Sequence, residues 1–166
     1  MPKKKLNLSS DTLPLPANAR RAVLPVDASA FLDSLARFTE ENFSAAARIE
    51  IPEPIYGIVP LSPEGSALFF KKLLRAVMGK HFITAVAEAK SGVMTLSFSA
   101  PGGIFLEPSE CISLIETAKQ AGFSPRFEEG KFVLKAEIHL TNFSTVYAHD
   151  IDKDAFYYTL CKLFFE

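Results

Sequence analysis

The chain has 166 residues, of which 48% are apolar and 22% charged, and its formal net charge is -1. This length corresponds to about one domain, which buries roughly 70% of the surface of the unfolded chain and can form a hydrophobic core without disulfides or metal ions. The composition excludes a disordered or fibrous protein, and the near-neutral charge gives no reason to expect nucleic acid as a partner.

Residues 1–26 are predicted to form an extended or disordered N-terminal arm, because four prolines restrict its backbone. Its basic residues, Lys3 to Lys5, are interpreted as solvated. They are not followed by the apolar core of a signal peptide, and the sequence has no run of about 18 apolar residues that could cross a bilayer. Cys111 and Cys161 match no metal or redox spacing. We therefore expect a cytoplasmic protein without a membrane partner.

The pattern turns helical after Asp27, a plausible N-cap, where apolar residues recur at three- and four-residue steps. Two short strands are predicted at 48–51 and 56–59. Ser62-Pro63-Glu64 then signals the start of a long helix that runs to about Met78. Its core face is predicted to carry Phe69, Leu73, Ala76 and Val77.

Alternating residues predict strands at 83–90 and 93–99, and a hairpin of strands at 123–127 and 131–140. Between these pairs, Ser109 is predicted to cap a helix that Gly122 ends. The strand patterns have one apolar face, which indicates a sheet covered on one side only. We therefore predict an α/β (α+β) protein, a two-layer sandwich whose mixed, mostly antiparallel sheet carries the main helices on one face.

Residues 27–140 are assigned to this domain, and residues 141–166 to a C-terminal extension. Asp152 or Asp154 can cap a final amphipathic helix in the extension. Its apolar stripe, which we expect either to pack on the domain or to contact another chain, consists of Phe156, Leu160, Leu163 and Phe164.

The predicted elements follow the order helix, strand, short strand, long helix and two strands, and the last strand ends at Ser99-Ala100-Pro101-Gly102-Gly103. This order resembles the ATP-binding domain of sensor histidine kinases, which belong to the GHKL or Bergerat-fold proteins. The resemblance spans about Val26 to Ile138 and rests on element order and hydrophobic pattern. It implies the histidine kinase-like ATPase fold. It also implies a nucleotide cleft between the Ser62 helix and the Pro101 turn.

The same comparison implies a degenerate ATP site. Ala76 stands where kinases have the Mg²⁺-binding Asn, and a methyl group offers no oxygen to a hard cation. Ser99 stands where they have the Asp that binds adenine, and the short link from Gly103 to Ser109 leaves no room for an ATP lid. We expect no cofactor and no catalytic residue. The vestigial cleft is predicted to contain Lys72, Ala76, Lys80, Ser99, Gly102 and Gly103.

No metal site is predicted either. Asp150-x-Asp152-x-Asp154 opens like a calcium loop, but Ala155 replaces the required glycine and Cys161 the closing glutamate. His81, His139 and His149 are scattered and form no ligand pair.

Two functional hypotheses remain open. The first hypothesis, which favours a protein that is not an enzyme, is a non-catalytic histidine kinase-like ATPase-fold protein. It would act as a regulatory or protein-interaction module in signalling and bind a protein partner. Homodimerisation through the C-terminal helix is a further option. The alternative is a divergent ATP-binding kinase or ATPase of the GHKL family, resembling anti-sigma factors or sensor kinases.

Overall fold

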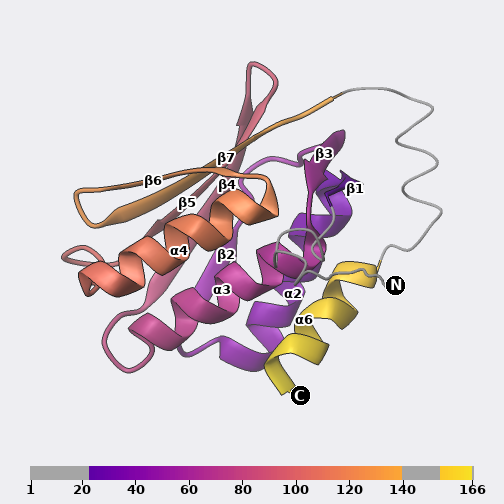
Figure 1. The fold of residues 1–166 in the computed structure, drawn as a ribbon. Coiled ribbons are helices and arrows are strands. Elements are labelled where there is room, and N and C mark those ends of the chain that lie inside the picture. The colour runs from indigo at the N-terminus through magenta and orange to yellow at the C-terminus, as the bar shows by residue number, and fades with distance from the viewer. Residues whose placement is uncertain (1–22, 140–153, 166) are drawn as a thin grey trace, which may run out of the picture.

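The computed structural model describes residues 23–139 and 154–165 as two layers, a sheet and a set of helices (Figure 1). The helices are α2 (Ala28–Phe43), α3 (Pro63–Val77), α4 (Pro108–Ala121) and α6 (Ala155–Phe165). In the part of the chain that the structure describes, none of them is long and apolar enough to cross a membrane.

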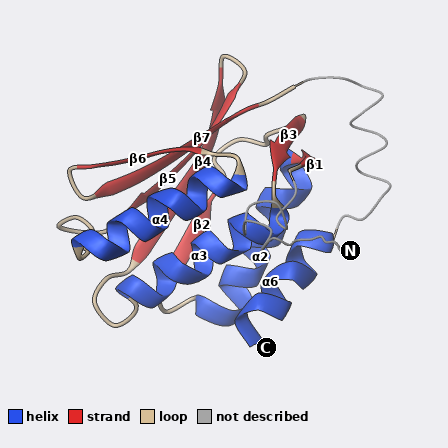
Figure 2. Cartoon of the chain, viewed as in Figure 1, coloured by secondary structure: helices blue, strands red, loops and turns tan. Residues whose placement is uncertain are grey.

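The strands form two sheets, which Figure 2 shows in red. The main sheet has the order β2-β4-β5-β7-β6, and only its β2–β4 pair is parallel. β1 and β3 form a small antiparallel pair. The strands are β1 (Leu24–Asp27), β2 (Ala47–Glu50), β3 (Ile58–Leu61), β4 (Ile83–Lys90), β5 (Val93–Ser99), β6 (Ser124–Glu128) and β7 (Lys131–Glu137). The predicted mixed, mostly antiparallel sheet is confirmed.

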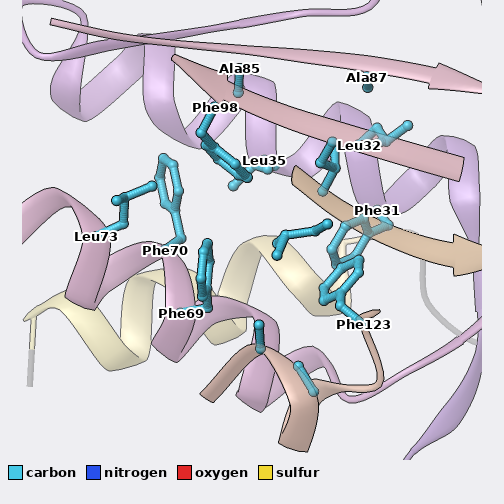
Figure 3. Close-up of a cluster of buried hydrophobic side chains, with 14 of the residues drawn as sticks. Phe31, Leu32, Leu35, Phe69, Phe70, Leu73, Ala85, Ala87, Phe98 and Phe123 are labelled. Carbon is cyan, nitrogen blue, oxygen red and sulfur yellow. The ribbon is translucent and has the colours of Figure 1, made fainter. Parts of the chain in front are cut away.

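Burial alternates along the central strands, so that one face of the sheet is covered and the other is not. The covered face carries Ile83, Ala85 and Ala87 of β4, Met94, Leu96 and Phe98 of β5, and Phe132, Leu134 and Ala136 of β7. The helices lie on this face, and Figure 3 shows Phe69 of α3 and Phe98 of β5 in the core between the layers. The ring centroids of these two phenylalanines are 5.7 Å apart. The predicted two-layer sandwich is therefore confirmed.

Most of the predicted helix ends are confirmed. An Asp27 carboxylate oxygen accepts from the Ala30 N–H at 2.9 Å, the Ser62 hydroxyl accepts from the Gly65 N–H at 3.0 Å, and Gly122 has the left-handed φ of 107°. The predicted Ser109 cap is wrong. The N-cap is Glu107, whose N–H donates to the Glu110 side chain at 3.0 Å, because Pro108 fits the first helical position, where no N–H is needed.

Three strands differ from the prediction by more than one residue. Residues 24–26, which we placed in the arm, belong to β1 and pair with β3. β3 begins at Ile58 because the backbone turns at Gly57, whose φ is 125° and whose carbonyl accepts from the Ala28 N–H. β7 ends at Glu137, after which His139 forms an isolated bridge with Ile58. Residues 1–22, and with them most of the predicted arm, lie outside the described residues, as do Asp150 and Asp152.

The final helix α6 packs on α2 and α3. Phe156 is buried and stacks on Phe31 of α2, with ring centroids 4.3 Å apart. At the other end of α6, the Lys71 ammonium of α3 donates to the Leu163 carbonyl. The apolar stripe of this helix therefore covers the chain's own core, the first of the two options that we predicted.

Candidate functional site

The cleft implied by the kinase resemblance would border α3, which packs side by side with α4 (Figure 1). The two helices are antiparallel, because Gly65 at the start of α3 lies against Ala121 at the end of α4. A Cβ atom added to Gly65 would stand 3.0 Å from both Cα and Cβ of Ala121. The helices therefore meet at this end without space for a ligand.

Lys72 bridges the two helices at the middle of this seam. Its ammonium donates to the Ser113 hydroxyl at 3.0 Å and to the Thr117 hydroxyl at 2.9 Å. The Thr117 hydroxyl in turn donates to the Ser113 carbonyl at 2.8 Å. Two of the three donors of the ammonium are therefore used within the protein.

A hollow of about 340 Å³ remains where α3 ends and α4 begins. Its lining is Lys72, Arg75, Ala76, Ser109, Glu110, Ser113 and Leu114. The hollow thus offers two cations, one carboxylate and two hydroxyls, while Ala76 contributes only a methyl group. The Glu110 carboxylate already accepts from the Glu107 N–H.

The Pro101 turn is held against the β6–β7 hairpin. Gly102 and Gly103 have positive φ values of 79° and 93°, which close the turn. The next N–H, that of Ile104, donates to the Gly130 carbonyl at 2.8 Å, and the Ile104 side chain is 2% exposed. A Cβ atom added to Gly130 would meet the Gly103 Cα at 2.8 Å. The two glycines therefore serve a backbone contact, and the link to α4 is anchored in the core.

Two more predicted cleft residues lie elsewhere. Ser99 follows the pleat of Thr95 and Ser97, which belong to the face of the sheet without helices, because successive side chains point to opposite faces. Lys80 is exposed and lines a separate hollow of about 630 Å³, formed by residues 41–46 and 78–82. The structure therefore brings Lys72 and Ala76 into one hollow and places neither Ser99 nor Lys80 there.

Ser113 and Thr117 were not predicted as site residues. They stand four residues apart, so they share one face of α4. That spacing was readable from the sequence. The identity of the helix that they face was not, because only the packing of α4 on α3 brings them to Lys72.

At two positions, Ala76 and Ser99, the side chains do not offer the contacts to Mg-ATP that the kinase resemblance implies. Mg²⁺ takes oxygen ligands in octahedral geometry, and Ala76 has none to give. Ser99 has the wrong orientation to accept from an adenine amino group in the helix layer. Among the residues that the structure describes, no three His, Cys, Asp or Glu side chains gather in a group that could hold a metal ion.

Comparisons with known proteins identify the fold. No protein-family profile matches the chain, and no curated protein sequence matches it. Among solved structures, the ATP binding domain of PrrB from Mycobacterium tuberculosis superposes with a TM-score of 0.50 at 15% identity, over 71% of this chain and 98% of that one. The Acinetobacter baumannii histidine kinase AdeS gives a TM-score of 0.47 at 8% identity, over 72% of this chain and 68% of that one. The element order and the match to PrrB show that this chain has the fold of a histidine kinase ATP-binding domain.

Proposed function

We propose that the protein is a non-catalytic histidine kinase-like ATPase-fold module that regulates a signalling protein by binding it. The observation that supports this most is the closed seam between α3 and α4. Gly65 touches Ala121 at one end of the seam, and Lys72 bridges to two hydroxyls at its middle. A nucleotide in that seam would have to separate the helices and break the Lys72 bonds.

The polar contacts that Ala76 and Ser99 do not supply determine how much weaker Mg-ATP binding is expected to be than in a kinase. A hydrogen bond to a charged group contributes about 1.5 to 3 kcal/mol, so the loss of two such contacts at Ala76 and Ser99 weakens binding by about two to four powers of ten. A micromolar site would become millimolar or weaker.

The alternative, a divergent ATP-binding kinase or ATPase, is favoured by one observation. Lys72 and Arg75 line the hollow at the first turns of α4, and both could contact a phosphate. Against it, Glu110 contributes a carboxylate to the same lining. If phosphates bind there, Lys72→Met will abolish the binding.

Isothermal titration calorimetry with Mg-ATP and Mg-ADP separates the two proposals, with the ATP-binding domain of PrrB as a positive control. We expect no saturable heat below about millimolar nucleotide and no thermal stabilisation, whereas a ligand at a hundred times its Kd adds about 2.7 kcal/mol. A Kd below about 100 μM that Lys72→Met removes would replace our proposal by the alternative. Lys119→Met, an exposed substitution on the same helix pair, is the control for nonspecific loss of charge.

The proposal includes a protein partner and a cytoplasmic location. A homodimer through α6 would use two large apolar side chains that this helix exposes, Tyr158 and Phe165, whose exposed fractions are 62% and 61%. Analytical ultracentrifugation would test the homodimer directly.

A further inference from the structure

The strand β4 has an edge that its neighbour does not cover. β4 runs over Ile83–Lys90, but β2 pairs only with residues Ile83 to Val86. The other edge of β4 pairs with β5 over nearly its full length. Among the described residues, no strand therefore lies beside residues 87–90 on the β2 side.

The backbone groups that point to this edge can be assigned. The Ile83 N–H donates to the Ala46 carbonyl at 2.9 Å, so Ile83 directs its backbone groups toward β2. Since alternate residues of a strand direct these groups to the same edge, Ala87 and Ala89 also turn theirs to the β2 side. The chain after β2 cannot continue the ladder, because Pro52 and Pro54 have no N–H to donate.

A groove of about 420 Å³ lies along this open edge. It is lined by Pro52, Glu53, Pro54, Ile55, Ala87, Glu88, Ala89 and Lys90. Ala87 is 0% exposed and Ile55 3% exposed, so both belong to the apolar wall of the groove, while the exposed Ala89 leaves space for a neighbouring backbone. An extended chain is the ligand that matches an open strand edge with an apolar wall.

The charges of the groove indicate the side chains that such a ligand would carry. Glu53 and Glu88 are both exposed, and among the described residues neither has an ion pair. Lys90 is the one cation of the lining, so carboxylates outnumber it. A basic side chain opposite Glu88 would gain a cross-strand pair of opposite charge.

We propose that this groove binds an extended segment of a protein partner, which adds to the sheet as a strand beside residues 88–90 and alternates apolar with basic residues. Its backbone would bond to the N–H and the C=O of Ala89, because the backbone of Ala87 is already covered. Its apolar side chains would lie on the covered side, near Ile55, and its basic side chains on the other side, near Glu88. The inference rests on the proposed function, since it names the kind of partner that the module binds.

The first test uses synthetic peptides and the full chain. We expect a fluorescent peptide of alternating lysine and valine to bind in a fluorescence anisotropy titration, and its counterpart of alternating glutamate and valine to bind at least about tenfold more weakly. N-methylation of alternate peptide residues removes N–H donors from one edge only. Methylation in one of the two alternating registers should abolish binding, while methylation in the other should leave it. Equal binding of all four peptides, or no binding of the lysine peptide, would overturn the proposal.

The second test uses protein variants. Ala89→Pro removes the N–H at the open edge and spares the bonds to β5, so it should weaken the lysine peptide about tenfold or more. Glu88→Lys should weaken it as well, and the same charge change at Glu137, two strands away on β7, should leave it within about twofold. Binding that survives both groove variants would place the peptide elsewhere.

Two further outcomes are distinguishable. If the chain dimerises in sedimentation and Ala89→Pro makes it monomeric, the occupant is a second copy and the partner proposal fails. If the peptide tests fail and calorimetry shows no Mg-ATP binding, the proposed peptide site in the groove is refuted but the proposed function is not. Mg-ATP binding at micromolar Kd refutes the proposed function, whatever the peptides do.

Discussion

Replacement of Leu73 by alanine tests whether α3 is the centre of the core. Leu73 is 0% exposed and belongs to the cluster that joins α3 to the sheet, beside Phe70 and Phe98 in Figure 3. Emptying a buried leucine site removes three carbon atoms and leaves a cavity, which costs about 2 to 5 kcal/mol. Against a total stability of about 5 to 15 kcal/mol, this is a large fraction of the free energy of unfolding.

Urea denaturation followed by circular dichroism measures this loss. With a slope of about 1 to 3 kcal/mol per molar urea, Leu73→Ala should lower the midpoint by about 1 M or more. The matched control is Ile112→Ala on α4, where the side chain is 64% exposed and the change should stay within about 0.5 kcal/mol. A loss below about 1 kcal/mol for Leu73→Ala would show that the core does not depend on this side chain as the structure implies.

Two other predictions concern the contacts of the helix layer. Gly65→Ala should destabilise the protein by about 1 to 3 kcal/mol in the same urea assay, because its methyl group would crowd Ala121 at 3.0 Å; a stabilised variant would contradict the closed seam. The Glu41 carboxylate, to which the Tyr157 hydroxyl donates, raises the pKa of Tyr157 from 10.0 to about 12, with desolvation as the second cause. The contribution of this pair to stability is therefore complete below pH 10 and is lost as pH rises through about 12. Ultraviolet titration of tyrosine ionisation should show the highest transition disappear in Tyr157→Phe and move down in Glu41→Gln, and an unchanged titration in both variants would contradict the assignment.

The sequence was sufficient for the elements whose signal is local. Ser62-Pro63 and Gly122 predicted helix ends because a cap depends on only a few neighbouring residues. The alternation of β4 and β5 predicted their bounds and their covered face for the same reason. Glu107 was not predicted as the cap because serine is a commoner N-cap residue than glutamate. Pro108 prefers the first position of a helix, and this preference makes the preceding residue, Glu107, the N-cap.

The packing of α6 and the α3–α4 seam were not predictable in the same way. α3 buries both Phe69, which contacts the sheet, and Phe70, whose ring centroid lies 6.2 Å from that of Phe164 in α6. A helix that is apolar on two sides must be covered on two sides, so Phe70 and Leu74 indicated that a further segment packs against α3 within the helix layer. Which segment supplies that layer depends on tertiary contacts between residues far apart in the chain.

The packing around α3 and the open edge of β4 indicate where a ligand can bind with little rearrangement. α3 is covered by the sheet, by α4 and by α6, so outside the hollow at the end of the seam a ligand between α3 and α4 would have to separate the helices or break the Lys72 bridge. At the edge of β4 the exposed Ala89 has no neighbouring strand in the described part of the chain, because β2 ends at Glu50 and Pro52 cannot continue the ladder. Binding at a preformed edge loses little free energy to reorganisation. This difference favours recognition of an extended protein segment at the sheet edge over recognition of a nucleotide between the helices.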